Sequence, residues 1–194
     1  MVFLNNDTEI ITANWIEQML GFCQREDVGA VGAKLYFPDD TVQHAGVVIG
    51  MGGIAGHIFS GTPRVEYGYQ ARLVSVQDMS AVTAACMMVK RSVFEQVDGF
   101  DERYQVAFND VDLCMKIRSV NQLIVFTPYV ELYHYESKSR GKEETRAQIE
   151  RFHGEIALFK KKWPEILKTG DPAYSVNLAL DNGNCTLRRV DEKR

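Results

Sequence analysis

The chain has 194 residues, and its 45% hydrophobic and 25% charged content is that of one packed globular domain or slightly more. Its 22 basic and 26 acidic side chains give a net charge of −4, and no basic stripe offers a surface for nucleic acid. No apolar run approaches the roughly 18 residues that a membrane-spanning helix needs. The four scattered cysteines lack zinc spacing, so we expect reduced thiols in a cytoplasmic protein.

The first third of the chain predicts a strand, a helix and a hairpin. Residues 2–4 have the character of the end of a buried strand, and the apolar spacing over 13–24 predicts a helix with Thr12 as its N-cap. Strands are expected over 28–37 and 42–49, joined by a turn at Pro38. Five glycines among residues 50–61 predict a mobile loop, either a lid over a substrate or a plain connection.

The rest of the chain alternates strands with helices. We expect strands over 73–76, 82–89, 123–126 and 130–134, a short helix over 91–97, and an amphipathic helix over 109–120 with Asn109 as its N-cap. Apolar side chains at three- and four-residue steps from Ile149 to Trp163 predict a long amphipathic helix. This alternation favours an α/β fold with helices packed on a sheet.

Three polar segments could carry chemistry, and the first follows the opening strand. Asn5, Asn6 and Asp7 stand where open α/β sheets bind ligands, beyond the carboxyl end of a strand. The Asp7 carboxylate could hold a hard divalent cation. The alternative is a helix-capping turn, because Asn and Asp favour turns.

The second segment opens the helix predicted over 109–120. Asp110 and Asp112 are two residues apart, so they point to different sides of the helix, and one can face a cleft while the other caps the helix. A carboxylate that faces a cleft is a candidate general base. Two ordinary helix caps are the alternative.

The third segment closes the last predicted strand. His134 stands at the strand end before a polar stretch that contains Arg140, so it could bind a metal, and the Arg140 fork suits phosphate. A hydrogen-bonded structural histidine and a surface arginine are the alternatives. His44, His57 and His153 are interpreted as structural histidines.

Together these segments resemble the family 2 glycosyltransferases of the GT-A fold. FLNNDTE resembles the family's metal-binding D-x-D region, and DGFDE with FNDVDLCMKIR resembles the glycine turn and the acidic motif that supplies a base. TPYVELYHYESKSRG resembles the closing histidine segment. HAGVVIGMGGIAGH, SAVTAACMMVKRSVF and DPAYSVNLALDNG are closest to members associated with bacterial O-antigen and surface-polysaccharide assembly.

The resemblance implies that a sugar moves, with inversion, from a nucleotide-diphosphate donor to a hydroxyl of a saccharide or lipid-linked saccharide acceptor. It places this reaction in the cytoplasm or at the inner face of the membrane. By the same resemblance, Asp7 and His134 hold Mn²⁺ or Mg²⁺, and Asp110 is the catalytic base. Asn5 and Asn6 would lie near the ribose and phosphates, and Arg140 near the leaving diphosphate.

The sequence also departs from the family pattern. Asn5 and Asn109 stand where members often carry acids, and the strands that hold the nucleotide base are missing. Residues 1–168 are therefore interpreted as the C-terminal portion of a GT-A domain, a partial mixed sheet flanked by helices, and residues 169–194 as a tail. We expect little or no transfer by this chain alone, and a homodimer that covers the apolar edge strand over 2–4.

Two other functions stay open. A non-catalytic binding or scaffolding module, or an inactive fragment, of a larger polysaccharide-assembly protein would explain the asparagines at positions 5 and 109. A nucleotidyltransferase is disfavoured, because its glycine- and lysine-rich donor loop is not seen.

Overall fold

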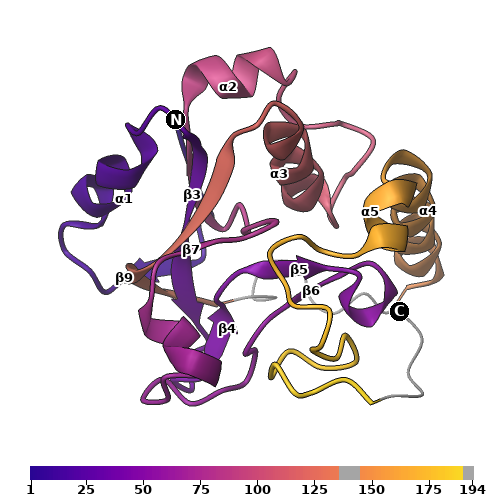
Figure 1. Cartoon of the computed structure of the whole chain (residues 1–194). Coiled ribbons are helices and arrows are strands. Elements are labelled where there is room, and N and C mark those ends of the chain that lie inside the picture. The colour runs from indigo at the N-terminus through magenta and orange to yellow at the C-terminus, as the bar shows by residue number, and fades with distance from the viewer. Residues whose placement is uncertain (136–144, 190–194) are drawn as a thin grey trace.

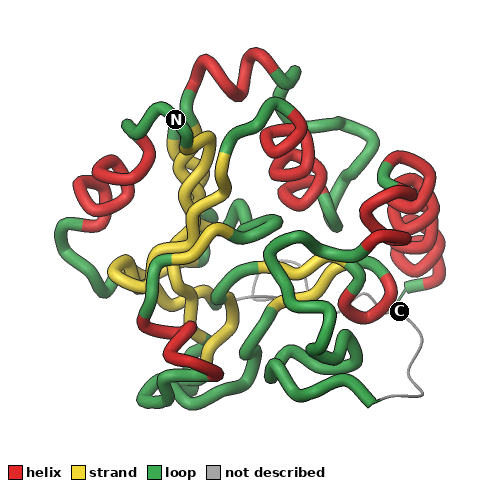
Figure 2. Tube along the Cα trace, in the orientation of Figure 1, coloured by secondary structure: helices red, strands yellow, loops and turns green. Residues whose placement is uncertain are grey.

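The computed structural model describes residues 1–135 and 145–189, and a mixed sheet runs through the middle of this fold (Figures 1 and 2). Its path is β1 (Val2–Leu4), β8 (Cys86–Val89), β3 (Val28–Tyr36), β9 (Leu123–His134) and β2 (Thr8–Ile10). β4 (Val42–His44) adds to β3, and β7 (Gln77–Asp78) adds to β9. β3 and β9 run parallel, and the other pairs are antiparallel. β3 is buried along its whole length, so it forms the spine of the domain.

Helices cover both faces of this sheet. α1 (Trp15–Cys23) lies on one face, where Met19 and Cys23 pack against Val31 and Leu35 of β3. α3 (Asn109–Ser119) lies on the opposite face and belongs to the larger of the two apolar cores. α2 (Arg91–Gln96) follows β8 directly at the edge of the sheet (Figure 1). The expected mixed α/β architecture is therefore confirmed.

The glycine-rich segment over 50–61, expected as a mobile loop, contains half of a short hairpin. β6 (Ala55–His57) pairs antiparallel with β5 (Val47–Ile49), and the 3-10 helix η1 (Met51–Gly53) joins them. The single strand expected over 42–49 is divided into β4 and β5, because Gly46 turns the chain with a φ of 107°. The second sheet that results stands beside the main one (Figure 2).

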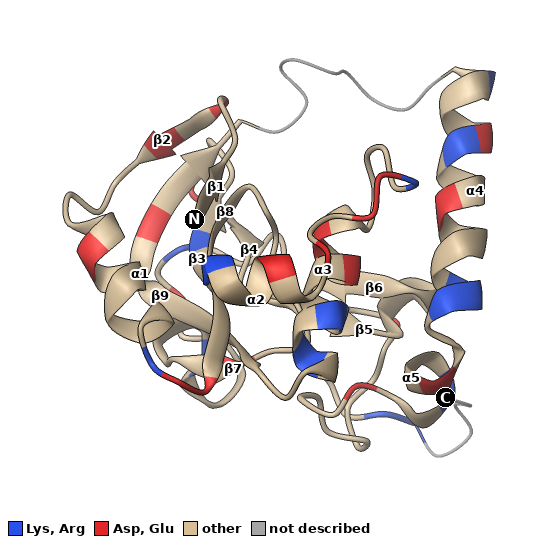
Figure 3. Ribbon diagram, turned by 90° about the horizontal axis from the view of Figure 1, so that it is seen from above, with Lys and Arg blue, Asp and Glu red and all other residues tan. Residues whose placement is uncertain are grey.

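The predicted long helix is α4 (Arg146–Lys162), which stands at the side of the domain with α3 between it and the sheet (Figures 1 and 3). A capping box between Thr145 and Gln148 fixes its start. Phe159 is fully buried, but Ile149 and Phe152 are 46% and 37% exposed. The apolar stripe is therefore core only in the second half of α4. The short helix α5 (Pro164–Thr169) follows it.

Both predicted N-caps were wrong by one or two residues. α1 begins after Asn14, not Thr12, and the Thr12 hydroxyl instead accepts the N–H of Glu131 at 2.9 Å, which joins the segment to β9. α3 begins after Phe108, whose φ of 63° places it in the left-handed region. Asn109 is the first helical residue, and its side-chain oxygen accepts the N–H of Asp110 at 2.7 Å.

Three strand predictions also differ from the structure. The segment expected as a strand over 73–76 lies partly in the 3-10 helix η2 (Tyr69–Val74), because Leu73 is drawn into the core and its carbonyl accepts the buried Lys34 ammonium. The strand over 82–89 is shorter, since only β8 pairs. The two strands expected around Pro128 are one, because a bulge between Thr127 and Glu131 accommodates the proline.

The C-terminal segment packs on the second sheet. The buried Asp171 carboxylate accepts the Ile49 N–H at 2.6 Å and the Ser80 hydroxyl at 2.6 Å. The carbonyl of Gly183 accepts the Phe59 N–H at 2.9 Å, and a Cβ at Gly183 would meet the His57 carbonyl at 2.7 Å. Only glycine permits this approach, so the tail residues up to 183 fit closely against β6. The division at residue 168 stays a prediction.

Candidate functional site

Polar residues from three segments meet at one end of the sheet. β2 pairs with β9 so that Thr8 lies opposite His134, which places the preceding Asp7 beside the same end of β9. Asp7 Oδ1 lies 3.2 Å from His134 Nε2, and Asn5 Nδ2 lies 3.1 Å from the same nitrogen. The structure thus brings together three of the predicted site residues, although His134 lies about 130 positions after Asn5 and Asp7 in the sequence.

Gln43 on β4 fixes the orientation of the His134 ring through two hydrogen bonds. Its amide nitrogen donates to the His134 carbonyl at 3.2 Å, so its amide oxygen, 2.7 Å from Nδ1, accepts a proton from the ring. Nδ1 therefore carries a hydrogen, and in the neutral form of the ring the lone pair of Nε2 faces the Asp7 carboxylate. An imidazole lone pair beside a carboxylate, with the other ring nitrogen held by an amide, is the donor arrangement of a metal ligand pair.

These two side chains suit a borderline or hard divalent cation, which accepts one nitrogen and carboxylate oxygens. Within residues 1–135 and 145–189, no three His, Cys, Asp or Glu side chains converge as a metal-binding group. A cation at Asp7 and His134 would therefore need further oxygen ligands from a bound substrate or water. Asn6 is exposed in the turn between β1 and β2. Arg140 lies outside the described residues.

Asp110 lies at the start of α3, and both of its carboxylate oxygens contact backbone. Oδ1 accepts the Val111 N–H at 2.8 Å, and Oδ2 accepts the Ala84 N–H at 3.1 Å. The next residue, Ala85, accepts the Asn5 N–H at 3.0 Å. The segment that enters β8 therefore connects the half-buried Asp110 directly to the strand end that carries Asn5 and Asp7.

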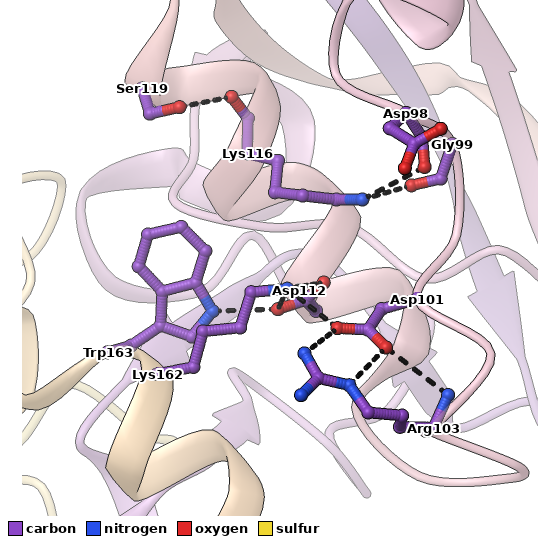
Figure 4. A network of polar contacts seen from close by, with 9 residues as sticks. All are labelled: Asp98, Gly99, Asp101, Arg103, Asp112, Lys116, Ser119, Lys162 and Trp163. Atoms are coloured by element: carbon purple, nitrogen blue, oxygen red, sulfur yellow. Dashed lines mark hydrogen bonds and ion pairs between the residues drawn. The ribbon is translucent and has the colours of Figure 1, made fainter.

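Asp112 neither faces a cleft nor caps the helix, which corrects the expected division of roles between the two aspartates. It is fully buried between α3 and α4 (Figure 4). Lys162 Nζ lies 2.9 Å from Oδ2, and Trp163 Nε1 donates to Oδ1 at 2.8 Å. Lys162 also donates to Asp101 at 2.9 Å. Although burial lowers it, the hydrogen bonds that the ammonium donates to both carboxylates raise the pKa of Lys162 overall. This network fixes α3, and with it Asp110.

The loop before α3 is held by a second buried carboxylate on α4. Glu155 is 3% exposed and accepts three consecutive backbone N–H groups at 2.8, 3.1 and 2.9 Å, from Gln105, Val106 and Ala107. Sequence reasoning missed Glu155 and Gln43. Each acts across about 50 to 90 residues of chain, and no local spacing indicates such a contact.

A pocket of about 340 Å³ opens beside His134, lined also by Phe37, Gln43, His57, Ser60 and Thr83. Behind its wall, the buried His44 contacts His57 through their Nδ1 atoms at 3.0 Å, and its Nε2 accepts the Thr83 N–H at 3.4 Å. Burial, followed by the nearby His57 and His134, lowers the pKa of His44 well below its ordinary value. His44 is therefore neutral and donates from Nδ1 to His57. The pocket wall therefore contains a hydrogen-bonded pair of histidines.

Comparisons with known proteins were made for the whole chain, and no protein-family model matches it. Protein y4gI of Sinorhizobium fredii, named as uncharacterized, is 46% identical over 188 residues, which are 96% of this chain and 21% of that protein. The O-antigen biosynthesis protein RfbC of Myxococcus xanthus is 38% identical over 196 residues, 99% of this chain and 15% of that protein. The N-acetylglucosaminyl-diphospho-decaprenol L-rhamnosyltransferase of Mycobacterium tuberculosis is 31% identical over 59% of this chain and 40% of that protein.

A solved structure gives the fold. A crystal structure of GalNAc-T7 with UDP, GalNAc and Mn²⁺ matches 86% of this chain and 32% of that chain, with a TM-score of 0.56 at 10% identity. The chain has a GT-A glycosyltransferase fold. The expected fold class and the resemblance to glycosyltransferases of surface-polysaccharide assembly are confirmed. The GT-A domain spans well under half the length of each of these relatives, so the activity of the whole protein is a matter for proposal.

No helix in the described part of the GT-A domain is both long and apolar enough to cross a membrane.

Proposed function

We propose that this GT-A domain transfers a sugar, with inversion, from a nucleotide-diphosphate donor to a saccharide hydroxyl in the synthesis of a bacterial surface polysaccharide. The observation that carries the proposal is the pair Asp7 and His134, with Nε2 3.2 Å from the Asp7 carboxylate and Asp110 anchored to the adjoining segment. The names of the RfbC and rhamnosyltransferase relatives support the substrate class. Such a protein would act in the cytoplasm or at the inner face of the membrane.

In the proposed reaction, Asp7 and His134 would hold Mn²⁺ or Mg²⁺, which when bound neutralises charge on the leaving diphosphate. Asp110 takes the proton of the acceptor hydroxyl as that oxygen forms its bond to the anomeric carbon. The bond from the same carbon to the diphosphate breaks on the opposite face, so the configuration inverts. Asn5 and Asn6 would bind the ribose and phosphates, and Arg140 the departing diphosphate.

The Ala84 N–H has a definite part in this reaction. Its hydrogen bond to Oδ2 holds the Asp110 carboxylate in place before the acceptor arrives. The network between α3 and α4 holds the helix to which this carboxylate belongs.

Calorimetric titration of UDP, GDP and dTDP into the chain, with and without Mn²⁺, tests the proposal. We expect Mn²⁺-dependent binding of at least one nucleotide, lost in Asp7→Ala and kept in Asp27→Ala, which removes a surface carboxylate paired with Arg25. Asp110→Asn should keep nucleotide binding, and in a longer protein that includes this domain it should abolish transfer. Absence of Mn²⁺-dependent binding by all three nucleotides, both in the chain and in that longer protein, would refute the proposal.

The alternative of a non-catalytic module differs in one result. Asn5 and Asn109 make the site less acidic than family members often are, which is the observation in its favour. Such a module would bind a nucleotide or saccharide with no turnover. Transfer that Asp110→Asn removes without unfolding the domain would exclude it.

A further inference from the structure

Two adjoining pockets lie beside the proposed metal pair, and both are lined in part by the glycine-rich segment over 50–61. The inner pocket is the one of about 340 Å³ beside His134. The outer pocket has about 460 Å³ and is lined by Phe59, Ser60, Gly61, Thr62, Pro63, Glu66, Gly68, Tyr69 and Asn184. Ser60 lines both, so the two are neighbours. Each volume lies in the usual range of about 300–1,000 Å³ for small-ligand sites.

We propose that these pockets form one acceptor groove that binds two consecutive residues of a neutral saccharide, the reacting residue in the inner pocket and the next in the outer one. The inference rests on the proposed function, since it assigns the groove to the acceptor of that reaction. It assigns binding roles to His57, Ser60 and Tyr69, and it explains why the tail packs on β6.

The inner pocket lies between the two halves of the candidate site. Gln43 and His134 form part of its lining, while the Nε2 edge of His134 faces Asp7 and Asn5. Thr83, also in the lining, directly precedes Ala84, which donates to Asp110. A molecule in this pocket would therefore contact Thr83, one residue away from the N–H that holds the proposed base, and also His134 of the proposed metal pair. We assign this position to the acceptor rather than to the diphosphate.

The polar groups of the inner pocket match hydroxyls rather than an anion. Among the described residues, no Lys or Arg lines it, and its polar lining groups are an amide, two imidazoles and two hydroxyls. His44 donates to His57 Nδ1, so the neutral His57 carries its own hydrogen on Nε2 and presents a donor of fixed position. Phe37 adds an apolar surface on which the C–H face of a pyranose ring can pack.

The outer pocket is also lined by hydrogen-bonding side chains. Tyr69 is 40% exposed, and Thr62 and Asn184 add hydrogen-bonding groups. Glu66 is the charged lining residue among those that the structure describes, so it would repel an anionic sugar or a phosphate. Asn184 comes from the tail, which Asp171 and Gly183 fix against the second sheet. The tail therefore supplies one wall of the groove.

Nuclear magnetic resonance titration of the chain with neutral methyl pyranosides of glucose, galactose, rhamnose and N-acetylglucosamine, and with disaccharides of the same sugars, tests the proposal. We expect at least one monosaccharide to shift the backbone amide signal of Thr83. The matching disaccharide should also shift that of Asn184 and bind more tightly. Inorganic phosphate and glucuronate are the anionic probes, and both should leave these two signals unchanged.

Substitutions of individual pocket residues test where the saccharide binds. His57→Ala removes one hydrogen bond and should weaken monosaccharide binding about tenfold. Ser60→Trp should block both pockets. Tyr69→Ala should bring the affinity ratio of disaccharide to monosaccharide close to one, whereas Tyr67→Ala, at a 68% exposed tyrosine outside both pockets, should leave that ratio unchanged.

The results separate this proposal from the proposed function. No shift of Thr83 by any neutral sugar, or shifts that persist in Ser60→Trp, would overturn the groove whatever the nucleotide titration gives. Preferential binding of phosphate would overturn it as well. Saccharide binding in the groove without Mn²⁺-dependent nucleotide binding would instead keep the groove and refute the transferase.

Discussion

Replacing Lys162 by Met should destabilise the domain, because the buried Asp112 carboxylate loses its cationic partner. The Asp112 side chain is fully buried, and the Lys162 ammonium lies 2.8 Å from Oδ1 and 2.9 Å from Oδ2 (Figure 4). Methionine keeps most of the aliphatic stem but removes the charge, so Asp112 would stay buried with only the Trp163 N–H as a side-chain donor. Breaking a buried ion pair from one side costs about 3–5 kcal/mol.

Two features lower that figure. The Lys162 side chain is 25% exposed, so water can replace part of the lost interaction, and the Trp163 hydrogen bond remains. We therefore expect a loss of about 2–4 kcal/mol in the free energy of unfolding. With a urea dependence of about 2 kcal/mol per molar, this lowers the urea midpoint by about 1–2 M. Far-UV circular dichroism is the readout, because tryptophan fluorescence would report the network itself.

The matched control is Lys160→Met, an exposed lysine on the same helix, for which we expect a change within about 0.5 kcal/mol. The double variant Asp112→Asn with Lys162→Met removes both charges, so its loss should be smaller than the sum of the single losses. If Lys162→Met differs from the wild type by no more than the control, the buried carboxylate does not depend on this lysine, and the reasoning is wrong.

Four further predictions concern other parts of the domain. Glu155→Ala leaves three backbone N–H groups without their acceptor and should lower the free energy of unfolding in urea by about 3 kcal/mol. A hydrogen bond to a charged group is worth about 1.5–3 kcal/mol, and the three losses are not additive. Because burial lowers the pKa of His44, only the unfolded chain takes up a proton at this residue below about pH 6.5. The free energy of unfolding should therefore fall by up to about 1.4 kcal/mol per pH unit on acidification, and it should fall less steeply in His44→Gln. Gln43→Leu should weaken Mn²⁺-dependent nucleotide binding about 10–100-fold in calorimetry, because it removes the hydrogen bond that orients the His134 ring. It also leaves buried His134 groups without that partner, so the free energy of unfolding should fall by about 1–3 kcal/mol. The 42% exposed Leu4 on the edge strand should support a homodimer that Leu4→Lys dissociates, and sedimentation equilibrium that finds a monomer at every concentration would contradict it.

The sequence predicts best what a strong periodicity or a strand end determines. β3, α3 and α4 lie within a few residues of the expected ranges, because apolar spacing over nine or more residues identifies each of them. Asn5, Asp7 and His134 follow or end strands, so the topology of the sheet alone brings them together. These residues could be proposed as a site without any knowledge of side-chain contacts.

Short apolar runs gave the wrong elements, for a physical reason. The segment over 73–76 has the composition of a strand, but four residues do not distinguish a strand from a buried turn, and Leu73 is held by a contact with Lys34 from 39 positions away. Pro128 reads as a strand break, yet a bulge in the parallel pairing absorbs it. In each case a long-range contact decides the local structure.

The same distinction runs through the candidate site. The groups proposed to touch the substrate lie at chain positions that the sheet topology fixes, whereas the groups that orient them are supplied by distant elements. Gln43 orients His134 across 91 residues, and Lys162 reaches Asp112 across 50. Residues of the second kind have no local signature, because their role is set by which elements pack together rather than by spacing within one element. Asp110, whose carboxylate accepts two backbone N–H groups, depends for its position on α4 as well, a helix that contributes no group to the proposed chemistry.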